Sequence, residues 1–182
     1  RFDEALKCFG RMQAEGFSPN KITFISVLNA CGSLCAVEDG EMIYNRVVYS
    51  GLEKDVVLGT ALVVFYSKCG VVAKAEYVLE QLPFRDVVSW NALIVGYAQQ
   101  GQFHEALNSL EQMQNEGLSP NVVTFTCILK ACGNAGATNK GKQIHDEILN
   151  RRYLEMDVVI GNALVGMYGR CGLLTEEQEV LN

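Results

Sequence analysis

Residues 16–34 read GFSPNKITFISVLNACGSL, and residues 117–135 read GLSPNVVTFTCILKACGNA. The two segments align without a gap, and Pro19 matches Pro120. The likeness extends in both directions, since residues 2–6 match 103–107 and residues 55–62 match 157–164. Self-similarity at a fixed long period is the signature of a repeat array, so the repeats must be located before a fold is argued.

The long period divides into shorter units that share one layout. Such units start at residues 21, 56, 87, 122 and 158, which gives spacings of 35, 31, 35 and 36 residues. Units of this length are typical of helix–turn–helix pairs that stack into a solenoid. We therefore predict one repeat array over residues 1–182, made of repeats 1–20 (partial), 21–55, 56–86, 87–121, 122–157 and 158–182 (partial).

Each unit carries the apolar pattern of two helices. In the unit that starts at residue 87, Trp90, Leu93, Ile94 and Tyr97 have the i, i+3, i+4, i+7 spacing of a helix face, and Gly101 then ends the helix. We expect Trp90 and Tyr97 to be buried between helices. The predicted fold is all-α, a right-handed α-α superhelix (solenoid) with antiparallel helices near residues 3–15, 22–33, 37–50, 57–68, 72–82, 88–100, 103–116, 123–134, 138–151 and 158–171.

Composition agrees with a packed, water-exposed protein. Apolar residues make up 49% of the chain, enough to bury cores between successive helix pairs. The longest apolar run, around residues 56–66, is about half the length of a membrane span, so we expect no membrane insertion. Because RFDEALKCF at the start already belongs to a repeat helix, we expect the chain to be a fragment of a longer protein.

The seven cysteines favour structural roles. Cys31 is repeat-equivalent to Cys132, and Cys69 to Cys171, which indicates small, buried helix positions. Cys31 and Cys35 are four residues apart and could share a helix face. The sequence has no Cys-x-x-Cys and no Cys/His cluster at zinc spacing, so we predict no metal site. An odd number of cysteines without a disulfide pattern favours a reducing compartment.

One segment imitates a catalytic motif. Residues 136–142 read GATNKGK and match most of a phosphate-binding loop. That motif needs Ser or Thr next to hold magnesium, and Gln143 stands there instead. His104 and His145 lack the partners of a catalytic triad or metal site. We predict no catalytic residue, no cofactor and no enzymatic activity.

Longer stretches resemble a known family. DVVSWNALIVGYAQQGQFHEALNSLEQMQNEGLSP (residues 86–120) closely resembles a pentatricopeptide repeat. NVVTFTCILKACGNAGATNKGKQIH looks like the long variant of that repeat, and the segments ending in Tyr66–Gly70 and Tyr168–Gly172 resemble the short variant. The order long, short, standard, long, short is similar to the PLS arrays of organellar members.

This resemblance implies binding of single-stranded RNA, with roughly one base per repeat, in a mitochondrion or plastid. In the family, the second residue of a repeat packs against the face of the base, while the fifth and the last residues read its edge. The packing residues implied here are Ile22, Val57, Val88, Val123 and Val159. The implied reading pairs are Ile25/Asp55, Thr60/Asp86, Asn91/Asn121 and Thr126/Asp157, followed by Asn162 alone.

The family's code gives these pairs a meaning. Thr with Asp favours guanine, so Thr60/Asp86 implies G, and Thr126/Asp157 weakly implies G because long repeats follow the code poorly. Asn with Asn favours a pyrimidine. Ile25 has no hydrogen-bonding group, so the base of the first long repeat is open. For each single residue the alternative is an ordinary helix cap or turn residue.

Charge opposes RNA binding, because the net charge is −6 and nucleic-acid binders usually present a basic surface. Lys68 and Arg170 occupy position 13 of the short repeats, where the family uses a cation to approach the RNA phosphate. The alternative is that both are solvated charges at helix ends. The rival function is a protein–protein scaffold or a structural subunit of a larger organellar complex, since stacked helix pairs suit either task.

Overall fold

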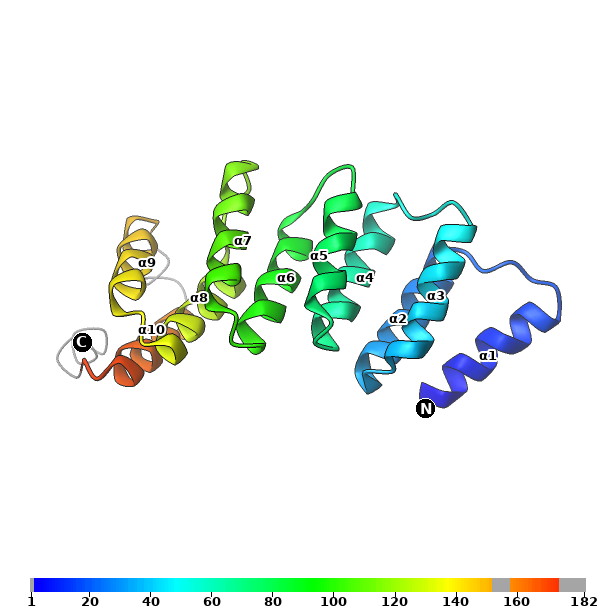
Figure 1. Ribbon diagram of the computed structural model, residues 1–182, viewed down its shortest axis with the longest axis horizontal. Coiled ribbons are helices and arrows are strands. Elements are labelled where there is room, and N and C mark those ends of the chain that lie inside the picture. The colour runs from blue at the N-terminus through cyan, green and yellow to red at the C-terminus, as the bar shows by residue number, and fades with distance from the viewer. Residues whose placement is uncertain (1, 152–157, 174–182) are drawn as a thin grey trace. The chain divides into compact units, whose positions relative to one another are not determined.

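The chain folds into helices throughout the part that the structure describes, residues 2–151 and 158–173 of a computed structural model (Figure 1). These residues contain no strand. The helices are α1 (Phe2–Ala14), α2 (Lys21–Leu34), α3 (Val37–Tyr49), α4 (Val56–Lys68), α5 (Val72–Gln81), α6 (Val87–Gln99), α7 (Phe103–Asn115), α8 (Val122–Ala135), α9 (Thr138–Asn150) and α10 (Val158–Cys171). The all-α prediction is confirmed, and every predicted helix end lies within one residue of the observed end.

Local chemistry explains why these ends were predictable. Gly70 and Gly101 follow α4 and α6 with φ of 75° and 72°, a left-handed conformation that glycine adopts without the steric cost of a Cβ. At the opposite ends, Asp55 and Asn121 accept backbone N–H groups of the first turn of α4 and α8. Both signals are short-range, so the sequence alone reports them.

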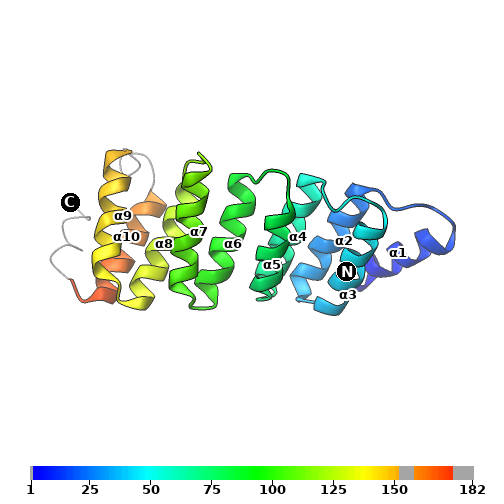
Figure 2. The same ribbon diagram turned by 45° about the horizontal axis from the view of Figure 1, so that its top comes forward.

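The chain divides into two compact units, residues 1–96 and 97–182. In the first unit, α2 and α4 pack side by side, and each packs against the helix that follows it, α3 or α5 (Figure 2). The Phe65 ring on α4 lies over Gly40 of α3, where an added Cβ would stand 1.9 Å from Phe65 Cζ. The first unit is therefore a two-layer helix stack with Phe65 and Tyr66 fully buried.

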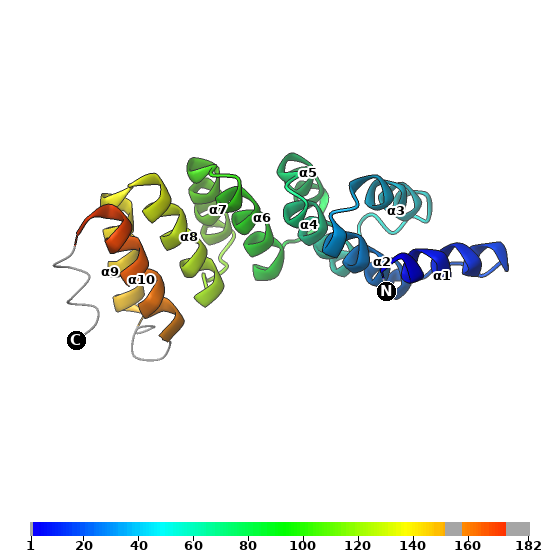
Figure 3. The ribbon, with the colours of Figure 1, turned by 90° about the horizontal axis from the view of Figure 1, so that it is seen from below.

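The second unit repeats this arrangement. Helices α8 and α10 lie side by side, and α9 packs against both (Figure 3). Met167 of α10 takes the place of Phe65, and a Cβ added to Gly141 of α9 would lie 2.6 Å from Met167 Sδ. The helix pairing predicted from the repeat pattern is thus seen in each unit. The repeat boundaries themselves remain a prediction.

The burial predictions are mostly confirmed. Trp90 and Tyr97 expose 3% and 6% of their surface, and Tyr66 and Tyr168 are buried as well. Cys31 and Cys132 are buried, whereas Cys69 and Cys171, expected to be buried too, are only half-buried because they lie at the ends of α4 and α10. Cys35 is exposed and shares no helix face with Cys31, since α2 ends one residue before it.

Candidate nucleic-acid interface

The second residue of every repeat is an exposed aliphatic side chain in the first turn of a helix. In the first unit the exposed fractions are 68% for Ile22, 58% for Val57 and 58% for Val88. In the second unit they are 50% for Val123 and 53% for Val159. Each of these side chains gives its own repeat one exposed apolar group that can contact a flat apolar partner.

The fifth residues differ from repeat to repeat. Thr126 is half-buried, and its Oγ1 donates to the carbonyl of Val122 at 2.7 Å, within its own helix. Thr60 is half-buried too, but its Oγ1 is shielded from water and has no hydrogen-bond partner among the residues that the structure describes. Asn91 is buried at 8% exposure, and Asn162 is exposed. The Thr60 hydroxyl therefore retains unused hydrogen-bonding capacity.

The last residues of the repeats act as helix caps wherever the structure describes them. Asp55 Oδ1 accepts the backbone N–H of Leu58 at 3.0 Å, and Asn121 Oδ1 accepts that of Thr124 at 3.2 Å. The capping role that the sequence left open is therefore present. Asp157 lies outside the described residues.

Asp86 caps its helix with one carboxylate oxygen and keeps the other available. Its Oδ1 accepts the backbone N–H of Ser89 at 2.8 Å, and the buried Ser89 hydroxyl bonds back to the backbone of Asp86. Asp86 itself is exposed, and its other oxygen, Oδ2, makes no hydrogen bond or ion pair within the described residues. The cap thus fixes the orientation of the carboxylate and leaves one acceptor oxygen for a ligand.

The first long repeat is arranged differently. Lys21 Nζ lies 3.4 Å from Asp55 Oδ2, so both oxygens of this last-position carboxylate are engaged. The backbone N–H of Leu58, and then the Lys21 ammonium, hold the pKa of Asp55 below its usual range. With the apolar Ile25 at the fifth position, this repeat has no unused polar group at either of its predicted reading positions.

The two predicted phosphate-binding cations lie at equivalent helix ends. Lys68 is the last residue of α4, and Arg170 lies in the last turn of α10, where both are exposed. Arg170 Nη1 donates to the carbonyl of Gly166 at 3.2 Å. A cation at a helix C-terminus interacts favourably with the helix dipole, so this placement also has a structural reason.

Two lysines in the second helix of their repeats are paired with acids. Lys74 of α5 forms an ion pair with Glu41 of α3, and Lys140 Nζ lies 3.6 Å from Glu111 Oε1. Lys140 belongs to the segment that resembles a phosphate-binding loop. In the structure Gly136 follows α8 as its C-cap, and α9 starts at Thr138. A phosphate-binding loop requires a strand before it, but here the preceding element is the helix α8.

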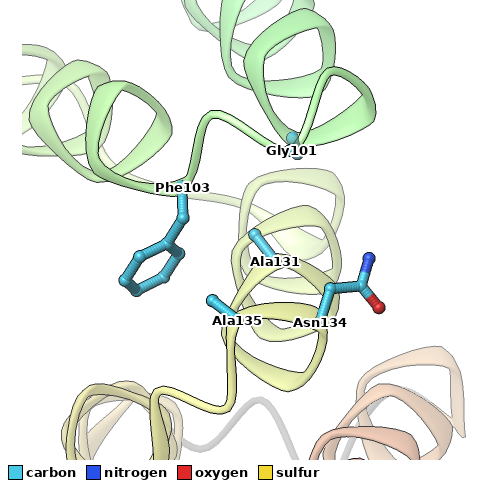
Figure 4. Close-up of a pocket in the computed structure, with 6 residues that line it drawn as sticks. Gly101, Phe103, Ala131, Asn134 and Ala135 are labelled. Carbon is cyan, nitrogen blue, oxygen red and sulfur yellow. The ribbon is translucent and has the colours of Figure 1, made fainter.

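Two hollows fall outside this pattern. A cavity of about 90 Å³ lies between α8 and the turn that joins α6 to α7, where Phe103 extends beside Ala131 and Ala135 (Figure 4). Small-molecule sites usually span about 300–1,000 Å³, so this cavity is too small for a cofactor. An open cleft of about 430 Å³ lies between α1 and α2 and includes Ile22 in its lining. No helix in the described ranges is long and apolar enough to cross a membrane.

Comparison with known families identifies the repeats. Residues 85–134 match the PPR repeat family, residues 2–33 match the pentatricopeptide repeat domain, and residues 123–153 match the PPR repeat. The chain belongs to the pentatricopeptide repeat family. The resemblance seen in the sequence is confirmed, while the PLS subtype stays a prediction.

Relatives cover almost all of the chain. A chloroplastic pentatricopeptide repeat-containing protein of Arabidopsis thaliana is 38% identical over 180 residues, which is 99% of this chain and 29% of that protein. A mitochondrial one of the same plant is 37% identical over 172 residues, 94% of this chain and 27% of that protein. The chain therefore spans less than a third of the length of these relatives.

Solved structures show the same fold. The pentatricopeptide repeat protein PPR10 from maize matches with a TM-score of 0.81 and 24% identity, over 100% of this chain and 26% of PPR10. PPR10 in complex with an 18-nt psaJ RNA element matches with a TM-score of 0.78 and 23% identity, over 96% of this chain and 26% of PPR10. At this identity the likeness establishes the helical-repeat solenoid fold of the pentatricopeptide repeat proteins.

Sequence reasoning missed several residues that shape the predicted interface. Ser89 and Thr124 bond back to the cap residues three positions earlier, and this spacing was a readable signal of a capping box. The ion pair of Lys21 with Asp55 joins residues 34 positions apart and had no such signal.

Proposed function

We propose that this chain binds single-stranded RNA in a mitochondrion or plastid, as part of a PLS-type pentatricopeptide repeat array, with about one base per repeat. One recurrent observation carries the proposal. An Asp or Asn that caps a helix is followed two residues later by an exposed Val or Ile, as in Asp86/Val88 and Asn121/Val123. Helix stability explains the cap, but it does not explain the exposure of the aliphatic residue.

The repeat over residues 56–86 offers the most complete set of groups. Val57 presents an apolar surface, and Asp86 has an oriented carboxylate with an available oxygen. The Thr60 hydroxyl is unpartnered but shielded, so its contact with a base requires the side chain to rotate toward the surface. An apolar face and polar groups directed at a base edge are what recognition of an unstacked RNA base requires. In the family's code this repeat takes guanine. Lys68 and Arg170 supply charge for the phosphates.

The organelle assignment rests on the relatives, which include chloroplastic and mitochondrial proteins. PPR10 was solved with bound RNA, which supports RNA as the ligand of the shared fold. A protein–protein scaffold is the second candidate. The Lys21–Asp55 ion pair and the net charge of −6 favour it, because both oppose RNA contacts.

A matched pair of valines tests the proposal. Val57 on α4 and Val48 on α3 are both exposed, at 58% and 45%, but only Val57 occupies a predicted base-packing position. Val57→Ser should weaken binding to a randomised short RNA, measured by fluorescence anisotropy at low salt, whereas Val48→Ser should not. Equal effects of the two substitutions, or no RNA binding by the unaltered chain, would favour the scaffold.

A further inference from the structure

The residue that follows α2 has an unusual backbone for its type. Cys35 has φ 49° and ψ 39°, and it is the one residue other than glycine with a positive φ in the described part of the chain. The repeat-equivalent residue after α8 is Gly136, with φ 64° and ψ 22°. The second unit thus has the residue that the left-handed conformation favours, and the first unit has a cysteine there. A residue other than glycine in this left-handed backbone conformation is strained, and such strain points to a use for its side chain.

The surroundings of Cys35 contain a second thiol. The exposed Cys35 Sγ donates to the carbonyl of Lys68 at 3.7 Å, and the next residue is Cys69, which follows α4. After burial, the neighbouring Cys35 is the next cause that raises the pKa of the Cys69 thiol, so the two side chains lie close together. In the second unit the equivalent Cys171 faces no such thiol, because Gly136 has no side chain, and its Sγ lies 4.0 Å from Met167 Sδ.

We propose that Cys35 and Cys69 form a reversible intramolecular disulfide, which links the C-terminal ends of α2 and α4. These helices already pack against each other, so the bond joins neighbours. Cys35 Sγ already contacts the carbonyl of Lys68, the residue before Cys69, so the two thiols are near neighbours of the kind that a bond of about 2.05 Å joins.

The oxidant is a small-molecule disulfide such as oxidised glutathione. The Cys35 thiolate attacks one sulfur of the reagent, forms a mixed disulfide and releases one glutathione thiolate. The Cys69 thiolate then attacks the Cys35 sulfur, closes the protein disulfide and releases the second glutathione. Two protein thiols lose two protons and two electrons, and the reagent's disulfide is reduced to two thiols.

The environments of the two cysteines set the order of these steps. Burial, and then the neighbouring Cys35, raise the pKa of Cys69 to about 12, so its thiolate is rare at neutral pH. Cys35 is exposed and meets the reagent first. Ring closure by Cys69 is the slower step and should accelerate as pH rises. Cys31 is also near Cys69 but is buried, so the reagent cannot reach it directly.

The test uses the full 182-residue chain with oxidised glutathione, followed by alkylation of free thiols and peptide mass spectrometry. The expected product is a peptide pair linked through Cys35 and Cys69 that dithiothreitol separates. Cys69→Ser should stop at a glutathione adduct on Cys35. Cys35→Gly, which copies Gly136, should fold and give neither product.

A gain-of-function control comes from the second unit. Gly136→Cys places a thiol at the position equivalent to Cys35 and should create a new link to Cys171. The proposal is overturned if the unaltered chain gives only a glutathione adduct on Cys35 even at raised pH. It is overturned equally if Cys35 pairs with Cys31 or Cys8 in place of Cys69.

Discussion

Asp86 serves two purposes in our account, and two substitutions separate them. Its Oδ1 caps α6 through the backbone N–H of Ser89, and its Oδ2 is available to a base. Asp86→Ala removes both oxygens. Asp86→Asn retains a carbonyl oxygen for the cap but places an amide NH₂ where the second oxygen was.

The cap sets the expected change in stability. Loss of an Asp cap to Ala costs about 1 kcal/mol, and the lost charge at the helix N-terminus adds roughly 0.3–1 kcal/mol. Asp86→Asn loses only the charge contribution. For a chain of this size, a change of about 1 kcal/mol shifts the melting temperature by about 2–4 °C, so Asp86→Ala should melt several degrees lower and Asp86→Asn close to the unaltered chain.

The change in RNA binding caused by the two substitutions should not parallel their change in stability. Guanine presents N–H donors along its Watson–Crick edge, and a carboxylate oxygen accepts them, whereas the amide NH₂ that Asp86→Asn introduces opposes them. Both substitutions should therefore remove a preference for guanine over adenine of about 1–3 kcal/mol at one position of a short RNA, measured by competition binding at fixed salt. An unchanged guanine preference in Asp86→Asn, with folding intact, would refute the assignment of Asp86 to the base edge.

Three further predictions concern packing, phosphate contact and pH. Gly40→Ala should destabilise the chain by about 1–3 kcal/mol in urea denaturation because its Cβ would overlap the Phe65 ring, whereas Gly10→Ala, with nothing within 4 Å in α1, should stabilise it by roughly 0.5–1 kcal/mol. Lys68→Ala should weaken binding to all RNA sequences alike and lower the salt slope by about 0.7, and a loss confined to one sequence would contradict a phosphate role. Burial lowers the pKa of His145 below its ordinary value near 6.5, so the folded chain binds fewer protons than the unfolded chain and loses stability as pH falls through that value. His145→Gln should show a smaller loss over the same pH range, and equal losses would count against His145 as the cause.

The helices were predictable because their signals are local. A cap such as Asn121 and a glycine such as Gly101 act within one turn of the chain, and the repeat places them again and again. The exposure of Val57 and Val88 also followed from the repeat, through the family's known layout. These features need no knowledge of which helices touch.

Features that depend on contacts between helices were not predictable. The burial of Asn91, the ion pair of Lys21 with Asp55 and the missing partner of the Thr60 hydroxyl each depend on packing between separate segments. The left-handed backbone of Cys35 was not predicted either, because cysteine rarely adopts this conformation. Only the alignment of Cys35 with Gly136 indicates it.

The central claim is that this chain recognises the bases of single-stranded RNA. Its most direct test is selection of bound molecules from a pool of randomised short RNAs at low salt, with crosslinking and sequencing of the RNA that the chain retains. Our account predicts weak binding, with guanine enriched at the position read by the repeat over residues 56–86. Retention of no RNA, or of RNA without any base preference, would contradict it.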